Sequence, residues 1–475
     1  MLTHEELSCA FGVTANERGA ALSANYGSAC YTAGHMEPDS GRTSLFASLG
    51  RALRHPNYRL FFAGQSISLI GTWLTRVASS WLVYRLTGSA LILGVVGFAG
   101  QIPTFLFAPL AGVWVDRVNR HRALVATQVL SMIQSGLLAV FTLTNTVTVA
   151  HVLVLQCFQG LINAVDMPAR QSFVVEMIED RRDLANAIAL NSSMVNAARL
   201  LGPSIAGVLI AAVGEGWCFS IDALSYVAVI ASLMAMKVSP HPNARPSHRL
   251  LADLVQGFRY AAASVPIRSI LVILALVSLM GMPYSVLMPA MASAVLHGGP
   301  NTLGFLMAAS GLGALTGTLY LASRKSVLGL GRVIGFSAAC FGGGLIAFAW
   351  SRTLWLSLVL MVPIGMAMMI QMAASNTVLQ TVVDEDKRGR VMSFYAMAFF
   401  GTTPFGSLLA GAVADRYGAP AAIFAGGAAC LFGGLAFFRA LPAVRKATRP
   451  IYVRLGILPD GAGGIQSDFP VSPDG

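Results

Sequence analysis

The chain has 475 residues, of which 55% are hydrophobic and only 11% are charged. An ordinary soluble protein is about 25% charged, so this chain lacks the polar surface that a globule of its size needs in water. The net charge of +11 comes from Lys and Arg residues in short loops between apolar runs. No aromatic residues are interleaved with them, so the pattern favours membrane topology over nucleic-acid binding.

The sequence also lacks the motifs of several chemistries. Its six cysteines contain no CxxC and its eight histidines no HxxxH, and no GxxxxGK[ST], GxSxG or HExxH motif occurs. These absences disfavour an ATP-driven pump, a metal site and a hydrolase. We therefore expect neither a cofactor nor enzymatic activity.

Apolar runs long enough to cross a bilayer occur along most of the chain. A spanning helix needs about 20 mostly apolar residues. Twelve such runs cover residues 59–85, 89–111, 122–143, 148–168, 187–213, 217–237, 269–296, 301–322, 330–350, 354–379, 391–414 and 417–438. They predict an all-α polytopic membrane protein with twelve transmembrane helices in two six-helix halves.

The regions outside these runs divide the chain. Segment 1–50 is polar, and segment 442–475 is rich in Pro, Gly and charge, so both are expected to be disordered. Segments 51–237 and 269–441 are the predicted halves, joined by linker 238–268. In the linker one apolar stripe contains Leu250, Leu251, Leu254, Val255 and Phe258. This spacing predicts an amphipathic helix lying on the membrane surface.

The distribution of Lys and Arg predicts the orientation. Of the 32 basic residues, only Arg85, Arg352 and Arg416 fall in one set of loops, while Arg76 and Arg199 lie inside predicted spans. The other 27 occupy the termini and the opposite loops. Because the richer side is normally cytoplasmic, both termini are expected inside a bacterial inner membrane.

A glycine pattern recurs in the two predicted halves. The first set is Gly202, Gly207 and Gly214, and the second is Gly406, Gly411 and Gly418, both with spacings of 5 and 7. Each set lies at the C-terminal end of the fifth predicted helix of its half. The recurrence favours a duplicated transporter architecture.

The loop after the second span carries a recognisable signature. It reads GVWVDRVNRHR and includes Gly112, Asp116, Arg117 and Arg120. It resembles the Gly-x-x-x-Asp-Arg-x-x-Arg-Arg/Lys loop of the major facilitator superfamily. Stretches such as LANAIALNSSMVNAARLLGPSIAG resemble its bacterial exporter branch, which includes enterobactin-type siderophore exporters and macrolide exporters. The corresponding loop of the second half, 322–326, keeps positive charge but has no acid.

The resemblance implies a function. It implies secondary active export of small amphipathic organic molecules, siderophore or drug-like, by proton antiport and alternating access. The expected partners are a small-molecule substrate, protons and the lipid bilayer, and we expect a monomer. Uptake or lipid flipping by the same fold stays an alternative, as does a non-transporting membrane sensor or scaffold.

The resemblance also implies a conformational latch. In it, Asp116 meets the beginning of span eleven near Arg390, and Arg120 bridges toward Asp166 at the end of span four. Gly112 is expected to end the second helix, and a carboxylate after it can be stabilised by a helix N-terminus. The alternative is that these are solvated loop charges that only set topology.

Arg199 lies near the middle of predicted span five, where a charge is expensive and usually faces a cavity or a partner. One interpretation is an anion or substrate contact in a central cavity. The other is a structural arginine that bonds carbonyl groups freed by Pro203. Arg76 in span one and Asp222 in span six are further candidates, which could pair or gate.

Other polar side chains are candidate cavity residues. On span four, Gln156, Gln159, Asn163 and Asp166 have spacings of 3, 4 and 3, which place them on one helical face. Asn196 on span five and Gln371 on span ten complete the set. Cavity lining and hydrogen bonding between helices both explain such a face.

Span five contains the text Gly202-Pro203-Ser204-Ile205-Ala206-Gly207. It resembles the Gly-Pro-x-x-Gly-Gly signature of proton-coupled antiporters, with an alanine in place of one glycine. The resemblance points to export and assigns Gly202, Pro203 and Gly207 to that signature. A packing kink explains the same residues without transport.

Overall fold

The computed structural model describes residues 51–115, 117–178, 180, 183–236, 250–324 and 326–459. They all belong to one compact unit, Leu49–Gly475. The expected disordered segment 1–50 lies outside the described residues, as do residues 460–475 of the expected tail. Within the described ranges the chain forms helices and no strand, so the prediction of an all-α fold is confirmed.

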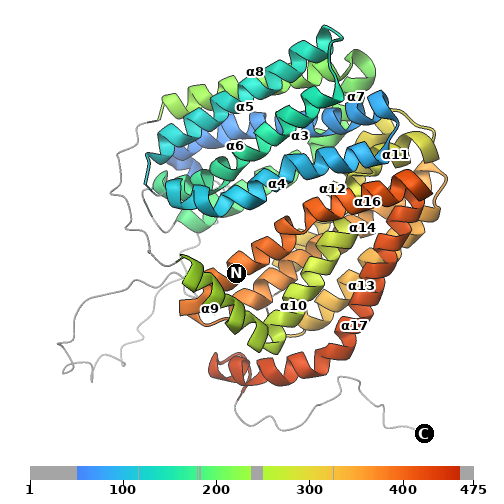
Figure 1. The fold of residues 1–475 in the computed structure, drawn as a ribbon. Helices are drawn as coiled ribbons and strands as arrows, with labels where there is room; N and C mark the ends of the chain where they lie inside the picture. Colours follow the sequence, from blue (N-terminus) through green and yellow to red (C-terminus); the bar gives the residue numbers. More distant parts are fainter. Residues whose placement is uncertain are drawn as a thin grey trace, which may run out of the picture. The chain divides into compact units, whose positions relative to one another are not determined.

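Six long helices follow the first six predicted runs, after a short turn, η1 (Arg51–Arg54). They are α3 (Pro56–Thr87), α4 (Ala90–Val115), α5 (Arg120–Leu143), α6 (Val149–Glu176), α7 (Leu184–Val213) and α8 (Glu215–Met234). Figure 1 shows them together in blue to green, with α3 packed along α7 and α8 and with α5 against α6.

Local chemistry explains where these helices begin and end. α3 starts with Pro56 at its first turn, where the missing N–H has no helical partner anyway. It ends at Gly88, whose φ of 62° is the left-handed conformation that glycine adopts without strain. Thr148 and His151 form a reciprocal capping box at the start of α6.

The second group of helices begins with the linker helix α9 (Leu250–Ala263). It continues through α10 (Val265–Leu276), α12 (Pro300–Ala322), α13 (Leu330–Trp350), α14 (Leu354–Val382) and α17 (Ala419–Arg454). The linker therefore contains a helix in this structure. It packs on the beginning of the eleventh predicted run, where the Phe258 and Phe394 rings lie 6.2 Å apart. Its position on a membrane surface stays a prediction.

Two of the predicted spans are irregular. After α10 the seventh run continues as η3 (Val277–Gly281), η4 (Met282–Ser285), α11 (Met288–Ala290) and η5 (Met291–Val295). The eleventh run is divided into α15 (Glu385–Ala396), a π-helical turn η6 (Met397–Gly401) and α16 (Thr403–Tyr417). Pro283, Pro289 and Pro404 fall in these stretches, and each lacks the N–H that a regular helix needs.

Eleven helical segments of the described chain are long and apolar enough to cross a membrane. The 32-residue helix α3 is not one of them, although it matches the first predicted run. Its sequence contains Arg59, Arg76 and Arg85 among several Ser and Thr residues, which lowers its hydropathy. The count of twelve spans therefore stays a prediction.

Helix α17 corrects the expected start of the C-terminal tail. It continues through Pro442 and Pro450 to Arg454, so residues 442–454 are helical. Val444, Thr448 and Tyr452 are buried along one face of this extension. Their spacing of four residues is a helical signal that the high content of Pro and charge obscured.

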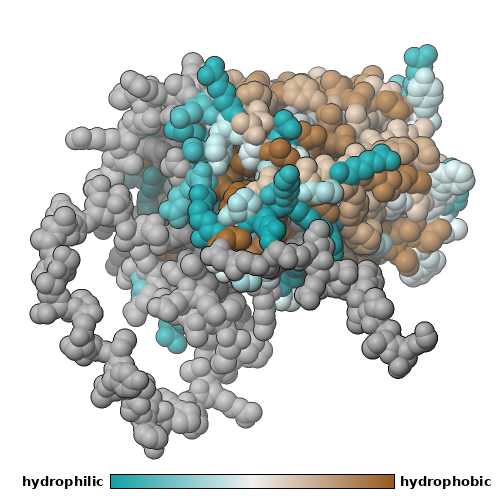
Figure 2. Space-filling view, turned by 90° about the horizontal axis from the view of Figure 1, so that it is seen from below, coloured by the Kyte–Doolittle hydropathy of each residue, from teal (hydrophilic) through white to brown (hydrophobic). Residues whose placement is uncertain are grey.

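Large hydrophobic side chains are exposed over much of the described surface. Figure 2 shows a broad hydrophobic area on one face, with hydrophilic residues gathered beside it. Trp217, Trp350 and Trp355 lie exposed at helix ends, as amphipathic aromatic residues do at a membrane interface. Such an area is too large for a soluble monomer and fits contact with lipid.

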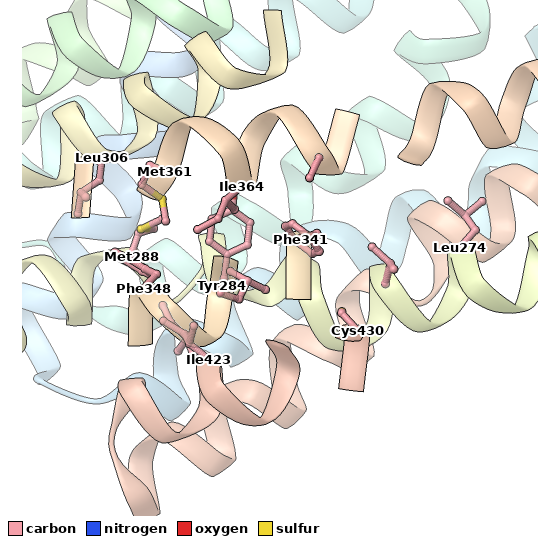
Figure 3. Close-up of a cluster of buried hydrophobic side chains, with 14 of the residues drawn as sticks. Leu274, Tyr284, Met288, Leu306, Phe341, Phe348, Met361, Ile364, Ile423 and Cys430 are labelled. Carbon is pink, nitrogen blue, oxygen red and sulfur yellow. The ribbon is translucent and has the colours of Figure 1, made fainter. Parts of the chain in front are cut away.

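The interior of the second group is a close-packed apolar core. Figure 3 shows Tyr284, Phe341, Ile364 and Cys430 from four different segments within it. The Tyr284 and Phe341 rings meet edge to face with centroids 5.9 Å apart. This core fixes the position of the irregular turn η4, which carries Tyr284.

Two glycine pairs bring the two groups into backbone contact. Between α7 and α12, a Cβ on Gly207 would lie 3.0 Å from the Cα of Gly304, and one on Gly304 would lie 2.9 Å from the Cα of Gly207. Between α4 and α16, a Cβ on Gly94 would lie 3.1 Å from the Cα of Gly411. We call these pairs the two glycine crossings. Only glycine lets the helices approach this closely.

The crossings are equivalent in the two halves of the glycine repeat. Gly207 and Gly411 are the central glycines of the two repeated sets, and Gly304 and Gly94 are their partners. The last glycines of the sets, Gly214 with φ +89° and Gly418 with φ +87°, make the same kind of turn into the next helix. The recurrence seen in the sequence therefore corresponds to repeated geometry.

Both crossings lie within about two turns of these glycine turns. We call the end of the bundle with connections at Gly88, Gly214 and Gly418 the glycine-turn end. The opposite end carries connections 117–119 and 323–329. The tight contacts between the groups are therefore concentrated toward one end.

Candidate transport site

Two arginines of the first helix group lie well inside predicted spans. Arg76 of α3 and Arg199 of α7 are close enough to interact electrostatically. The Arg76 guanidinium also stacks on the ring of Trp73, with its Cζ 4.7 Å from the ring centroid. We call Arg76 and Arg199 the interior arginine pair.

Among the described residues the pair has no acidic counterpart. Within the described ranges, no Asp or Glu forms an ion pair with Arg76 or Arg199. The Arg76 side chain nevertheless remains accessible to solvent, and Arg199 is partly accessible. Two like charges held together without compensation repel each other, so an anion between them would stabilise both.

Hydroxyl groups of the second helix group face the same region. Tyr284 of η4 lies within electrostatic range of Arg199, and its hydroxyl is 2.9 Å from Ser310 Oγ of α12. The site therefore combines cations from α3 and α7 with hydroxyls from η4 and α12. This combination can bind a negatively charged group through charge-assisted hydrogen bonds.

The structural interpretation of Arg199 finds no support in the hydrogen bonds. Pro203 cannot donate to the Arg199 carbonyl one turn earlier, and that carbonyl faces Gly311 of α12 instead. Of the described hydrogen bonds, none joins the Arg199 guanidinium to a freed carbonyl group. A role of Arg199 in a cavity stays a prediction.

The basic and acidic residues of the expected latch have other partners in this structure, and the latch pairing itself stays a prediction. Arg120 Nη1 at the start of α5 lies 2.5 Å from Glu176 Oε1 at the end of α6. Asp166 instead pairs with Arg170, one turn along the same helix, and accepts hydrogen bonds from Thr127 and Gln128. A salt bridge one turn along a helix can form without any tertiary change, which explains why Asp166 takes this partner.

Other latch residues are placed only in part. Gly112 lies inside α4, which runs on to Val115, so it does not end the helix as expected. Asp116 lies outside the described residues, and so does its expected contact with the beginning of α15. The backbone N–H of Arg117 donates to the Trp114 carbonyl, 3.0 Å away, in the turn that follows α4.

The polar face of span four packs partly against α5. Gln159 Nε2 donates to Ser131 Oγ of α5 at 3.2 Å and to Asn163 on its own helix at 3.2 Å. Gln156 lies beside Gly100 of α4, at a contact between helices. Both interpretations, cavity lining and interhelical hydrogen bonding, therefore apply to parts of this face.

Asn196 and Gln371 occupy different environments. Asn196 is half-buried and donates to the Ser192 carbonyl one turn earlier. Gln371 is only 1% exposed and lies 3.5 Å from Ser375 on its own helix, so it does not line an accessible cavity. Gly202 and Pro203 are buried, and Gly202 packs directly on Trp73, beside Arg76.

Arg76 and Asp222, which the sequence offered as residues that could pair or gate, form no ion pair among the described residues. Asp222 Oδ2 accepts hydrogen bonds from Thr75 Oγ1 and Ser135 Oγ, both at 2.6 Å. The roles of Thr75 and Ser135 were missed in the sequence. Ser135 belongs to a polar stripe at helical spacing on α5, and that spacing was the available signal.

A pocket of about 290 Å³ lies between α3 and α7, lined by Phe62, Ser66, Met194 and Leu201 among others. Its walls are almost entirely apolar, and neither member of the interior arginine pair lines it. We therefore take the arginine pair, and not this pocket, as the candidate site.

The helices have a lipid-facing surface, are closely joined at one end and surround a cationic interior. Together these features define the class of multi-pass membrane transporters. Residues 47–451 match the family model described as Transmembrane secretion effector. The chain therefore belongs to this family, in the exporter branch of the major facilitator superfamily, and it is a transporter and not an enzyme. The resemblance drawn from the sequence is confirmed.

Similar proteins agree with this assignment. The chain is 25% identical to the staphyloferrin A transporter of Staphylococcus aureus (strain NCTC 8325 / PS 47), with 76% of this chain and 90% of the relative covered. It is 26% identical to the multidrug efflux pump Tap of Mycolicibacterium fortuitum, with coverages of 78% and 92%. The crystal structure of the nucleoside transporter NupG shares the fold, with a TM-score of 0.63, 14% identity and coverages of 82% and 99%.

Proposed function

We propose that the chain exports small amphipathic organic molecules, siderophore or drug-like, from a bacterial cytoplasm in exchange for protons. The relatives named as a siderophore transporter and as an efflux pump support this substrate range and direction. Uptake or lipid flipping would use the same fold with the opposite polarity or another substrate. A sensor or scaffold would move nothing.

The proposed arrangement has twelve spans in the bacterial inner membrane, with α3 as the twelfth. Segments 51–237 and 269–441 form the two halves, and linker 238–268 joins them in a monomer. The distribution of Lys and Arg supports an arrangement with both termini in the cytoplasm and the glycine-turn end facing outward. The tight contacts at that end then correspond to a state closed to the outside.

The two equivalent glycine crossings are the observation that carries this proposal. They join the two groups through backbone contacts at matching positions of a duplicated structure. Surfaces of this kind can separate by a rocking motion without breaking a side-chain network. Alternating access in transporters built from repeats has this character.

The interior arginine pair supports a substrate with at least one negative charge. Arg76 and Arg199 come from two helices of the first group, and Tyr284 approaches from the second. An anion bound here would contact both groups, so its binding and release would follow the rocking motion.

The latch belongs to the same proposal. Asp116 would meet the start of α15 when the cytoplasmic end closes, where a helix N-terminus stabilises a carboxylate. Arg120 is held by Glu176 in the present structure. Closing would then require a rearrangement of the charges at this end.

Everted membrane vesicles test the proposal. Vesicles with an acidic interior should accumulate anionic carboxyfluorescein and staphyloferrin A more than cationic ethidium, and an uncoupler should abolish accumulation. Vesicles carrying Arg199→Ala should accumulate much less of the anionic probes. Accumulation only under the opposite proton gradient would replace export by uptake, and no accumulation of any probe would reject transport of this class.

A further inference from the structure

Asp222 of α8 is a buried carboxyl group shared by three helices. Its side chain is 1% exposed. Oδ2 accepts hydrogen bonds from Thr75 of α3 and Ser135 of α5, and Oδ1 has no hydrogen-bond partner among the described residues. Gly71 of α3 leaves room beside Oδ1, because a Cβ there would lie 2.6 Å from it.

The charged and titratable groups around Asp222 are all engaged elsewhere or lie farther along their helices. Arg76 of α3 stacks on Trp73 near Arg199 of α7, and Arg85 of α3 pairs with Glu215 of α8. His121 of α5 contacts the Leu233 carbonyl. Tyr226 lies one turn along α8 from Asp222. Asp222 thus has no cation in the described structure to balance a negative charge. A buried charge without a partner is costly, whereas a carboxylic acid with its proton on Oδ1 keeps both hydroxyl bonds and carries no charge.

A buried polar stripe on α5 runs along the helix from this carboxyl group toward another one. The stripe consists of Thr127, Gln128, Ser131, Gln134 and Ser135, each nearly fully buried. Thr127 and Gln128 donate to Asp166, and Ser135 donates to Asp222. From Gln128 to Ser135 the helix rises about 10 Å. Gln128 Oε1 and Gln134 Nε2 have no partner among the described residues, so the stripe keeps unused hydrogen-bonding capacity.

We propose that Asp222 carries the coupling proton and that the stripe conducts it between Asp222 and Asp166. One proton binds Oδ1 and converts the carboxylate to a neutral acid. On release it passes along the stripe to Asp166 and to water at the end of the bundle that carries Arg120 and Glu176. This inference rests on the proton antiport proposed above.

The same geometry couples the proton to the substrate. Thr75, which donates to Asp222, is the chain neighbour of Arg76 in the interior arginine pair. Protonation of Asp222 weakens the charge-assisted hydrogen bond from Thr75. This change in the Thr75 hydrogen bond acts on the adjacent residue of α3, Arg76. The binding of a proton at Asp222 and the binding of an anion at Arg76 are therefore coupled.

Two measurements on the full chain test this inference. The first follows the carboxylic acid C=O band by infrared spectroscopy of purified protein during a pH titration. A titrating band should be present in the wild type and in Glu385→Gln, which removes an exposed carboxyl group, and should be lost in Asp222→Asn. The second uses proteoliposomes with carboxyfluorescein as the probe. Asp222→Asn should lose accumulation driven by a proton gradient but keep exchange of probe at equal pH.

Each outcome decides between the two proposals. If the wild type accumulates probe and Asp222→Asn does so equally well, Asp222 is not the proton carrier and antiport itself stands. If the wild type shows no proton-driven accumulation, antiport fails and the inference fails with it. If Asp222→Asn does not fold, Ser135→Ala is used as the test variant in its place. It should slow accumulation and keep exchange, and an unchanged rate would overturn the role of the stripe.

Discussion

Gly207 in α7 and Gly304 in α12 face each other so closely that a Cβ on Gly207 would lie 3.0 Å from the Cα of its partner. The nearest atoms also include the Pro300 carbonyl, 2.8 Å away, so backbone and not a flexible side chain fills the space. Gly411 and Gly94 repeat this relationship between α16 and α4. The closure of one end therefore depends on the absence of side chains at four positions.

Gly207→Ala should bias the protein toward the state in which the glycine-turn end is open. Overpacking of this kind costs about 1–3 kcal/mol, which shifts a two-state population about 5- to 150-fold. Spin labels at the ends of α7 and α12 would report a longer distance. Gly136→Ala in α5 is the matched control, because no atom lies within 4 Å of its added Cβ. An equal shift in both variants would contradict the role of the crossing.

Arg199→Ala should impair binding of an anionic probe while leaving expression intact. A hydrogen bond to a charged group contributes about 1.5–3 kcal/mol, so the Kd for carboxyfluorescein should rise about 10- to 150-fold. Arg199→Lys keeps the charge but lacks the planar fork of donors, so a partial loss would show that geometry matters. Arg416→Ala, at an exposed arginine near the end of α16, should bind normally. Normal binding by Arg199→Ala would remove Arg199 from the site.

The ion pair of Arg120 and Glu176 should appear as an energetic coupling. Residues in direct contact show coupling energies of about 0.5–3 kcal/mol in double-mutant cycles. The cycle combines Arg120→Ala with Glu176→Ala and follows the unfolding of the purified protein in detergent. A second cycle with Arg120→Ala and Asp166→Ala should give a coupling near zero. The reverse result would restore the contact that the signature had suggested.

The C-terminal extension of α17 should loosen in acid. Arg454 Nη2 lies 3.0 Å from Asp384 Oδ1, and this hydrogen bond lowers the pKa of Asp384, which precedes α15 outside the spans. Because the folded pKa is depressed, the contact contributes stability above the unfolded pKa and loses it as pH falls through the folded pKa.

Hydrogen exchange of residues 442–454, corrected for the intrinsic effect of pH, measures this loss. Asp384→Asn should raise exchange at neutral pH and remove most of its dependence on acid. Arg454→Ala should raise it to a similar extent, whereas Glu385→Gln should not. Wild-type protection that stays constant through acid pH would show that the extension is held by its buried apolar face alone.

The sequence by itself determined the class of protein. A run of about 20 apolar residues can satisfy its backbone in lipid only as a helix, so local composition predicted most of the observed helices. The 5-and-7 spacing of Gly202, Gly207 and Gly214 likewise predicted a repeat, because close backbone contact requires glycine wherever it occurs. The loop signature at Asp116 indicated the superfamily without any knowledge of contacts.

Only the tertiary structure decided which polar side chains meet. Asp166 forms an ion pair with Arg170, and Arg120 forms one with Glu176. Asp222 accepts hydrogen bonds from Thr75 and Ser135 on two other helices. Hydropathy describes what one segment buries, but it contains no information about which faces of distant helices pack together. The partner of a buried charge depends on that packing, because hydrogen bonds and ion pairs act over a few ångströms between residues far apart in the chain.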